Sequence, residues 1–525
     1  MKSKLLAVML LTFAPAAFAL EGQFGIHDPS TIIQCDGKFY VWGTGGNPLV
    51  SDDGWTWRAG TPTPRTGLAP DVIHVGDRYY MYIARNVGAQ PKAEIEMLSN
   101  KTLNADSPEF KWEPGGIVAT TDGIEDCNGI DPGVLLDPQG KLWLTYGSYF
   151  GYIRVVELDP QTGQRLDPHA KPVDLAINCE ASIMIHHDGW YYLLATHGSC
   201  CQGANSNYNL RVGRSKNATG PFVDHDDLDM MQGGGKLFLG SESRLVGPGH
   251  FGRLDLGNGA EVFSYHYEED LDHPGNFGNL AIRPLLWDDG WPVAGENAKA
   301  GTYMLLSERT GTALELGVEG VPLSGRGRGP GGGRGPGGPS ATPGNAVAGG
   351  TPQAGAAPVA DAVPGAGAPP APGGGARGGG RGPRVIGPPI PPQDVAVVSK
   401  NWPTGKIPTR MANYLDQAQQ KWTVSAAPNA GGYPGAPYFK ITVAGTDRAL
   451  AATAEGELIT VPAFTVAPEE LWAIQQLTDG SYRIAPKSVP GSKEQLALSA
   501  IGNSFATLAK FDPASDRQRW HLKRL

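Results

Sequence analysis

The sequence predicts an all-β protein whose first part is a five-bladed β-propeller. One spacing occurs four times: an ionisable residue opens a short apolar run, and a glycine follows nine residues later, directly after a polar residue. The ionisable residues are Asp28, Asp131, Glu180 and His250, and the glycines are Gly37, Gly140, Gly189 and Gly259. Another apolar run follows each glycine. A polar–glycine pair between two apolar runs is typical of a β-hairpin.

A fifth unit completes the repeat. The stretch DVIHVGDRYYMYIA from Asp71 has the same shape with a shorter first arm. Five such units, separated by 39 to 70 residues, predict the blades of a propeller. Because the ionisable residue occupies the same place in four blades, we expect the four side chains to meet at one end of the central axis.

The N-terminus is typical of a secretory signal peptide over residues 1–19. Lys2 and Lys4 precede an apolar stretch, and Ala17-Phe18-Ala19 forms a small-residue cleavage motif. No later stretch reaches the twenty apolar residues that a membrane-spanning helix needs. We therefore expect a secreted or periplasmic protein without a membrane span.

Cysteines and charge narrow the class of protein. Five cysteines are too few and too irregular for a disulfide framework or a zinc site, and burial is expected for most: Cys35, Cys127, Cys179, Cys200 and Cys201. The pairing of Cys200 with Cys201 stays open. The net charge is −9, and the six arginines of residues 321–392 make the remaining chain more acidic still. An acidic surface argues against a nucleic-acid partner.

The second part of the chain is a strand-rich repeat region with an insertion. Residues 318–398 are mostly Gly, Pro and Ala, a composition that cannot bury a core, so disorder is expected. The segment from Gly301 before it matches segments from Pro437 and Gly480 after it. Each repeat closes with a Gln/Glu-x-Trp motif, and the first motif comes only after residue 398. A long surface insertion has a small entropic cost, so it can sit inside the first repeat.

These observations predict four segments: a signal peptide (1–19), a propeller (20–298), a second domain formed by 299–317 and 399–525, and the inserted segment 318–398. The three repeats, which end at Trp422, Trp472 and Trp520, resemble a ricin-type β-trefoil. That resemblance implies glycan binding through an acid after the leucine of each repeat. The positions are Glu315, Ala451 and Ala497, so a mainly structural module is the alternative.

Three carboxylates at one register indicate hydrolytic chemistry. Asp28 lies in HDPS, Asp131 in GIDPG and Glu180 in CEAS. Each alone is compatible with a turn or a surface position, but crowded carboxylates repel one another unless they serve chemistry. Crowding keeps one group ionised and another protonated. Glycoside hydrolysis needs such a base and acid.

The same motifs, in this order, resemble glycoside hydrolase family 43, and within it the arabinanases. The stretch SCCQGANSNYNLRVGRSKNATGPFVD from Ser199, LVGPGHFG around His250 and IRPLLWDDGWP from Ile282 extend the resemblance over residues 22–295. It implies endo-acting cleavage of α-1,5-L-arabinan. It also implies Asp28 as general base, Glu180 as general acid and Asp131 as the residue that raises the pKa of the acid and orients it. The implied mechanism is inversion, with about 6.5–9.5 Å between acid and base.

The resemblance also implies one calcium ion beside the axial His250. Calcium prefers oxygen ligands, so water molecules have to complete its shell. Tyr149 and Phe150, after a strand of the third blade, and Asn205, Ser206 and Tyr208, in a loop at the cleft, are the candidate contacts to arabinan or arabino-oligosaccharides.

Two departures and several alternatives remain. Leu68 stands where the family has a tryptophan, and Phe251 where it has an asparagine. An exo-acting α-L-arabinofuranosidase or a β-xylosidase on the same fold is the first alternative. A fructan hydrolase and a non-catalytic glycan-binding protein are the others. The oligomeric state is not indicated.

Overall fold

The computed structural model describes residues 20–87, 93–120, 129–149, 151–242, 244–272, 278–318, 393–502 and 505–525. The predicted signal peptide, Cys127, Phe150 and nearly all of the inserted segment lie outside the described residues. The described chain is nearly all β, with one short helix and six 3-10 turns: α1 (Val395–Val398), η1 (Gly203–Asn205), η2 (Met230–Gln232), η3 (Ser399–Asn401), η4 (Ala418–Gln420), η5 (Pro468–Glu470) and η6 (Asp516–Gln518). None of its helices is long and apolar enough to cross a bilayer.

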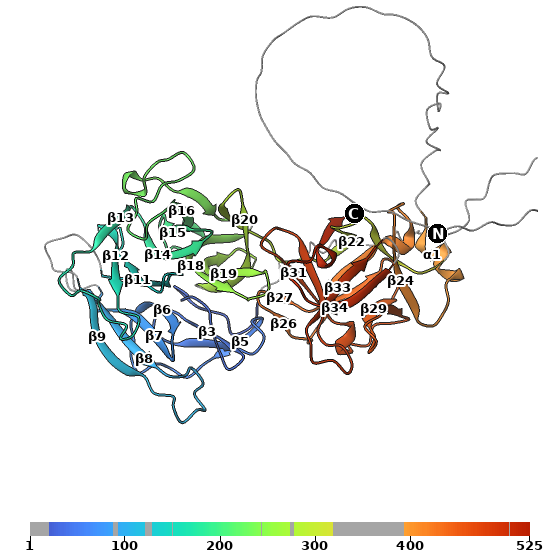
Figure 1. The fold of residues 1–525 in the computed structure, drawn as a ribbon, viewed down its shortest axis with the longest axis horizontal. Coiled ribbons are helices and arrows are strands. Elements are labelled where there is room, and N and C mark those ends of the chain that lie inside the picture. The colour runs from blue at the N-terminus through green and yellow to red at the C-terminus, as the bar shows by residue number, and fades with distance from the viewer. Residues whose placement is uncertain are drawn as a thin grey trace, which may run out of the picture. The chain divides into compact units, whose positions relative to one another are not determined.

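Five consecutive antiparallel sheets form the blades of a propeller, coloured from blue to yellow-green in Figure 1. The first blade contains β2 (Ile33–Cys35), β3 (Lys38–Trp42), β4 (Pro48–Ser51) and β5 (Thr56–Ala59), with β1 (Glu21–Gly22) added in parallel to β5. The second contains β6 (Leu68–Val75), β7 (Arg78–Arg85), β8 (Glu94–Asn100) and β9 (Glu113–Thr120). The third contains β10 (Gly133–Leu136), β11 (Leu142–Tyr146), β12 (Tyr152–Leu158) and β13 (Val173–Ile177).

The fourth blade contains β14 (Glu180–His187), β15 (Trp190–His197), β16 (Asn209–Ser215) and β17 (Lys236–Leu239). The fifth contains β18 (Leu245–Asp255), β19 (Glu261–Asp270), β20 (Asn279–Asp288) and β21 (Trp291–Ala294). The strand order within each blade follows the chain, so the predicted five-bladed propeller is confirmed.

The predicted polar–glycine turns join the first two strands of the blades. Asp36 and Gly37 have φ angles of 49° and 74°, and Asp188 and Gly189 have 47° and 72°. Two consecutive residues with positive φ are required by the hairpin turn whose twist matches that of its strands. Asp-Gly supplies both at little cost.

The ring closes by hydrogen bonds between the first and last blades. The amide of Ile26 donates to the carbonyl of Gly278 (3.0 Å), and the amide of Leu280 donates to the carbonyl of Phe24 (2.9 Å). Closure joins the last blade to the segment that precedes the first blade. It also brings the segment that contains Asp28 against β19 and β20.

Buried polar side chains connect neighbouring innermost strands. Asp71, the acid of the shorter fifth unit, accepts from the amides of Thr31 and Val134, both at 2.9 Å, and so joins the first three blades. The hydroxyl of Thr145 donates to the carbonyl of Ser182 (3.0 Å) between blades three and four. Such satisfied buried groups hold the inner strands in a defined register.

The described C-terminal region is built of β-strands that follow the propeller in the chain. They are β22 (Gly301–Ser307), β23 (Ala313–Leu316), β24 (Ile407–Ala412), β25 (Trp422–Ala426), β26 (Gly432–Tyr433), β27 (Ala436–Pro437), β28 (Phe439–Val443), β29 (Ala449–Ala452), β30 (Leu458–Val461), β31 (Trp472–Gln476), β32 (Tyr482–Pro486), β33 (Leu496–Ile501), β34 (Phe505–Lys510) and β35 (Trp520–Arg524). β22 pairs with β25 and β35, and β23 pairs with β24, so strands on both sides of the inserted segment share one sheet.

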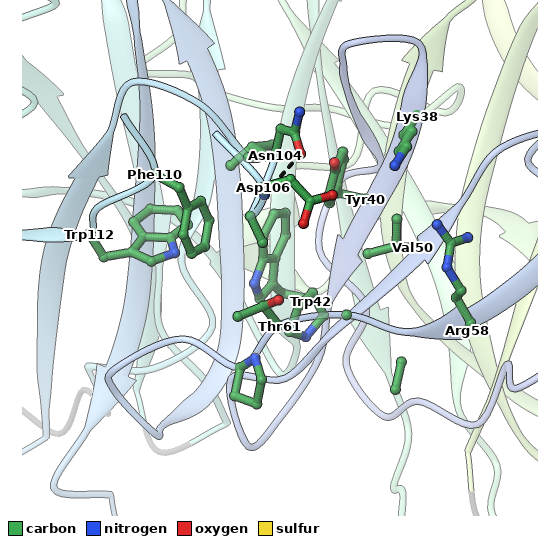
Figure 2. Close-up of a pocket in the computed structure, with 16 residues that line it drawn as sticks. Lys38, Tyr40, Trp42, Val50, Arg58, Thr61, Asn104, Asp106, Phe110 and Trp112 are labelled. Atoms are coloured by element: carbon green, nitrogen blue, oxygen red, sulfur yellow. Dashed lines mark hydrogen bonds between the residues drawn. The ribbon is translucent and has the colours of Figure 1, made fainter. Parts of the chain in front are cut away.

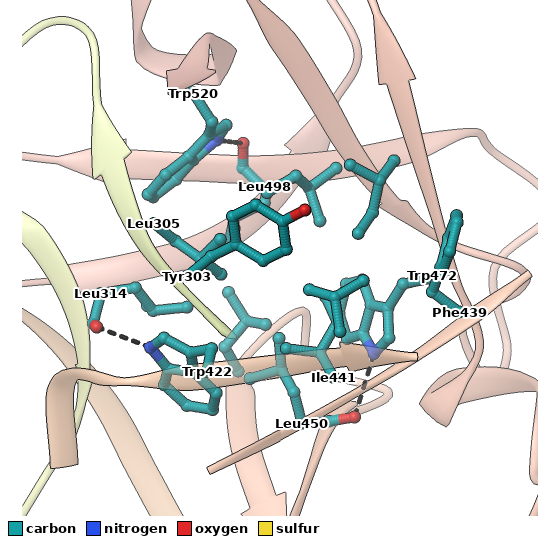
Figure 3. Close-up of a cluster of buried hydrophobic side chains, with 14 of the residues drawn as sticks. Tyr303, Leu305, Leu314, Trp422, Phe439, Ile441, Leu450, Trp472, Leu498 and Trp520 are labelled. Carbon is teal, nitrogen blue, oxygen red and sulfur yellow. Dashed lines mark hydrogen bonds between the residues drawn. The ribbon is translucent and has the colours of Figure 1, made fainter. Parts of the chain in front are cut away.

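Three tryptophans mark the repeats (Figure 3). Trp422, Trp472 and Trp520 are fully buried, and each follows a 3-10 turn. Each indole Nε1 donates to the carbonyl of the leucine of its own repeat, at 2.8, 3.0 and 2.9 Å. Since the first of these bonds joins Trp422 to Leu314, the first repeat is assembled from both sides of the inserted segment.

The ends of the inserted segment differ from the expected bounds of 318–398. Val318 is buried in the core of the C-terminal strands, and its carbonyl accepts from Nη2 of Arg410 (2.9 Å). At the other end, the side chain of Asp394 caps α1 by accepting from the amide of Ala396 (2.9 Å). Apolar and capping residues at both ends therefore belong to the folded part.

Candidate active site

The predicted site residues lie in or just before the innermost strands of four blades. Asp28 precedes β2, Asp131 precedes β10, Glu180 begins β14 and His250 lies in β18. Asp28, Asp131 and His250 have φ angles of 52°, 54° and 62°, and in the fourth blade Ala181 has 50°. Residues other than glycine rarely adopt positive φ, and such strain is concentrated at functional sites. The strand register also shifts next to Glu180 and next to His250. Such β-bulges change the direction of the side chains beside them.

Asp28 is held by two histidines and a threonine. Its Oδ2 lies 2.9 Å from Nδ1 of His27 and accepts from the hydroxyl of Thr44 at 2.6 Å. Its Oδ1 lies 3.5 Å from Nδ1 of His250. Burial raises the pKa of Asp28, but the hydrogen bonds and charges of His250 and His27 outweigh it and lower the pKa well below its usual value. Asp28 is therefore ionised.

A second carboxylate stands behind this pair. Glu268 is fully buried, and its Oε1 lies 3.0 Å from Nε2 of His27 and 3.2 Å from Nε2 of His266. Its Oε2 accepts from the amide of Cys201 at 3.2 Å. The amide of Asp28 donates to Nδ1 of His266 at 3.1 Å, so the proton of that imidazole resides on Nε2 and faces Glu268.

His27 is an imidazolium between two carboxylates. Burial lowers its pKa, but hydrogen bonds to Asp28 and Glu268 and the charges of both raise it to about 10. Burial lowers the pKa of His266, which leaves that ring neutral. The result is a chain of alternating charge, Asp28–His27–Glu268, that ends on the amide of Cys201.

Asp131 and Glu180 form the opposite half of the site. Oδ2 of Asp131 accepts from the amide of Ala181 at 3.1 Å, directly after Glu180. Burial, followed by the charges of Glu180 and Asp28, raises the pKa of Asp131 well above its usual value. Burial and the charge of Asp28 also raise the pKa of Glu180, against a hydrogen bond from Tyr208 that lowers it. Among the three predicted carboxylates, the pKa of Asp28 is thus lowered, whereas the pKa values of Asp131 and Glu180 are raised.

The candidate substrate contacts differ in position. Tyr208 is buried, and its hydroxyl donates to Oε1 of Glu180. The hydroxyl of Tyr149 donates to the carbonyl of Thr196 (3.0 Å), and that of Ser206, also buried, accepts from the amide of Gln202 (3.0 Å). Asn205 is exposed, and Phe150 lies outside the described residues. Tyr208 and Ser206 are therefore engaged within the protein.

Sequence reasoning missed His27, His266, Glu268 and Thr44. His27 is next to Asp28 in the chain, and that adjacency was the available signal; the other three are distant in sequence. Cys200 and Cys201 form a disulfide between neighbouring residues, and Cys35 and Cys179 are buried and free. The two disulfide sulfurs lie within 4.8 Å of ligand atoms of His27 and Glu268, so the disulfide borders the charged chain.

The side chains around His250 decide which kind of cation the site could hold. His250 is 6% exposed, and its Nδ1 lies 3.5 Å from Oδ1 of Asp28. The carboxylates nearby are already engaged by histidines. The donor set fits an ion that contacts the protein mainly through water.

Comparison with known proteins identifies the catalytic region. Residues 25–292 match the sequence profile of the glycosyl hydrolases family 43. The chain belongs to this family. The predicted family resemblance is thereby confirmed, and the protein is a glycoside hydrolase.

Named relatives of this family 43 chain include two extracellular enzymes. The extracellular exo-α-(1→5)-L-arabinofuranosidase ArbA of Cellvibrio japonicus is 31% identical, with 52% of this chain and 87% of the relative covered. The extracellular endo-α-(1→5)-L-arabinanase 1 of Bacillus subtilis is 29% identical, with 53% and 91% covered. A solved α-L-arabinanase of Cellvibrio cellulosa, complexed with arabinohexaose, is 28% identical, covers 52% of this chain and 96% of its own, and has a TM-score of 0.48.

Proposed function

We propose that this family 43 chain is an exported enzyme that hydrolyses the α-1,5-L-arabinofuranosidic links of arabinan with inversion. The observation that carries the proposal is that Asp28, Asp131 and Glu180 meet at one end of the propeller, where their surroundings shift the pKa values in opposite directions. The pKa of Asp28 lies below its usual value and that of Glu180 above it. An inverting glycosidase needs this pair, a base and an acid. The names of the relatives support arabinan as the substrate.

In the proposed mechanism, Asp28 accepts a proton from a water molecule whose oxygen attacks the anomeric carbon. The bond from that carbon to the glycosidic oxygen breaks as Glu180 donates its proton to the leaving oxygen. Asp131 holds the backbone next to Glu180 by accepting from the amide of Ala181. His27 and His250 keep Asp28 ionised. Exchange with water then returns a proton from Asp28 and restores one to Glu180.

Endo action is the preferred form, and exo action is the second candidate because one named relative is exo-acting. The test is a time course on linear debranched arabinan with wild type, Glu180→Ala and the exposed-site control Glu109→Ala. Early mixed oligosaccharides that are absent with Glu180→Ala support endo cleavage. Arabinose alone from the first time point supports exo action. No hydrolysis of arabinan, xylan or aryl glycosides, with binding retained, contradicts the enzymatic proposal.

We also propose one calcium ion beside His250, with water as its main ligand. When bound, the ion would supply positive charge to a pocket that collects carboxylates. Chelator treatment is expected to lower activity and to shift the melting temperature of wild type, and calcium is expected to restore both. A His250→Ala variant whose melting temperature still responds to calcium in the same way contradicts this site.

Export is proposed from residues 1–19 and supported by the names of the extracellular relatives. Sequencing of the secreted protein is expected to begin at Leu20. A mature protein that still begins at Met1 contradicts the cleavage site.

For the C-terminal repeats we propose a ricin-type β-trefoil with a mainly structural role. The three equivalent tryptophan bonds support the repeat. Glu315, the acid of the first repeat, is buried and accepts from Nε of Arg410 (2.6 Å) and from Nε2 of Gln420 (2.8 Å), so it is engaged inside the fold. An experimental structure without three-fold related repeats contradicts the fold, and sugar bound at Glu315 contradicts the role.

A further inference from the structure

A cavity of about 400 Å³ lies between the first and second blades (Figure 2). Aromatic rings form much of its lining: Tyr40, Trp42, Phe110 and Trp112. In Figure 2 the rings of Phe110 and Trp112 lie on one side of the Trp42 indole, with Val50 and Arg58 on the other. This volume falls within the range of pockets that bind small molecules.

The cavity is separate from the candidate active site. Asp28 lies before β2, whereas the turn at Asp36 follows that strand. Nδ2 of Asn104 donates to Asp36 (3.2 Å), and the amide of Leu103 donates to Sγ of Cys35 (3.4 Å). The loop 103–112 that lines the cavity is therefore anchored at the end of β2 opposite to Asp28.

The lining combines aromatic rings with polar side chains. Asp106 is exposed at the mouth, next to Asn104, whose side chain accepts from the amide of Asp106 (3.1 Å). Carboxylate and amide groups offer acceptors and donors to hydroxyls.

Charge indicates a neutral ligand. Lys38 and Asp106 carry opposite charges at the cavity. The second cation, Arg58, is paired with Asp52, with Nη1 and Oδ2 3.1 Å apart. An anionic ligand would meet no net positive field here, because every cation of the lining has a carboxylate to offset it.

We propose that this cavity is a non-catalytic binding site for pentose units of a neutral polysaccharide. A sugar ring presents C–H groups on its faces and hydroxyls at its edge. The aromatic walls receive the faces, and the side chains of Asp106 and Asn104 receive the hydroxyls. The assignment of that polysaccharide as arabinan rests on the proposed function. The site would hold the chain of the polymer on the enzyme between cleavage events.

The test compares the kinetics on a polymeric substrate with the kinetics on a short oligosaccharide. Two cavity variants and one control are compared with wild type. The double variant Asp106→Ala/Phe110→Ala removes one polar and one ring contact, and Ala105→Trp fills the cavity. The control is Glu109→Ala, because Glu109 is an exposed carboxylate of the same loop that does not line the cavity. We expect KM for debranched arabinan to rise about three- to tenfold in the first two, because attachment at a second site raises the effective concentration of the polymer. Hydrolysis of arabinotriose is expected to stay unchanged in all three.

Equal KM values for arabinan in wild type, both cavity variants and the control overturn the site while the proposed function stands. Absence of arabinan hydrolysis in wild type overturns the proposed function instead. Electrophoresis through gels that contain debranched arabinan, linear xylan or polygalacturonate then tests whether the cavity binds a neutral polysaccharide. Retardation by a neutral polymer that the cavity variants relieve supports the site, and retardation that is equal in all variants, or occurs only with polygalacturonate, overturns it. If the double variant does not fold, Ala105→Trp alone decides.

Discussion

At the scale of single residues, the ionisation of the proposed base Asp28 depends on the charges of His27 and Glu268 beside it. Glu268 accepts from two imidazoles that both contact Asp28. Burial raises the pKa of Glu268, but hydrogen bonds from His266 and His27 outweigh it and lower the pKa to about 2. Glu268 is thus a permanent anion that positions the base.

A Glu268→Gln substitution tests this positioning role. It keeps the volume but removes the charge that holds His27 as an imidazolium. We expect kcat on arabinan to fall about 10- to 100-fold, the effect found for outer partners that orient functional groups, with little change in KM. Glu261→Gln is the matched control, since Glu261 is also a buried carboxylate on β19 and pairs with Arg253 (2.8 Å). A loss of kcat that is equal in both variants would reduce Glu268 to a structural role.

The hydrogen bond from Tyr208 to Glu180 affects the pH at which activity falls on the alkaline side. The proposed acid Glu180 must be protonated, so activity falls as pH rises through its pKa, which lies above the usual value. The Tyr208 hydroxyl donates to Glu180 and favours the ionised form, which lowers that pKa. Tyr208→Phe removes the donor, so the pKa rises and the alkaline limb of kcat/KM moves up by about one pH unit. The acidic limb, set by Asp28, is expected to stay below the usual pKa of an aspartate.

Tyr149→Phe is the control for this measurement, because the hydroxyl of Tyr149 donates to Thr196 and not to Glu180. An alkaline limb that moves down in Tyr208→Phe, or moves equally in both variants, contradicts the assignment.

At the scale of elements, the innermost strands are close enough to require small residues. A Cβ at Gly133, at the start of β10, would overlap the carbonyl oxygen of Ser182 in β14. The same pair of strands is joined by the Thr145 hydroxyl and by Asp131, which bonds to Ala181. The spacing of these two strands therefore fixes the distance between Asp131 and Glu180.

Gly133→Ala is expected to force β10 and β14 apart. Overpacking of this kind costs about 1–3 kcal/mol, and the displaced carboxylates should also lower kcat. Chemical denaturation and arabinan kinetics measure the two effects. Gly240→Ala is the control, because a Cβ there meets nothing within 4 Å, and we expect its stability to match wild type. Full activity in Gly133→Ala would contradict a rigid spacing of the two strands.

At the scale of the whole molecule, the C-terminal repeats fold across an insertion of unusual composition. The bond between Trp422 and Leu314 and the pairing of β23 with β24 join residues on both sides of it. Because closure entropy grows slowly with loop length, about 0.6 kcal/mol for each doubling, the repeats tolerate the segment.

Replacement of residues 319–391 by a flexible Gly/Ser linker of about 15 residues, which spans about 20 Å, is expected to leave arabinan hydrolysis intact. The free energy of unfolding should change by less than about 2 kcal/mol. Denaturation and a product time course provide the measurement. Loss of the folded state would show that the segment contributes contacts, and loss of polymer cleavage alone would show that it takes part in substrate capture.

Much of this architecture could be predicted from the sequence alone. Strand alternation, polar–glycine turns and the nine-residue register are local patterns, because backbone geometry and turn chemistry act between near neighbours. The register therefore predicted the five blades and placed Asp28, Asp131, Glu180 and His250 in or just before the innermost strands of four blades. Tyr208 was predicted as a substrate contact in a loop at the cleft, whereas in the structure its hydroxyl is buried and donates to Glu180.

Contacts between distant residues were decided only by the tertiary structure. His27 and Glu268 lie 241 positions apart and meet because the ring of blades closes. The cavity beside Trp42 likewise requires a loop of the second blade to fold against the first. No local pattern encodes such pairs, since each depends on how the blades pack against one another. The charges of the site, and hence which carboxylate is ionised, follow from burial and from these distant partners.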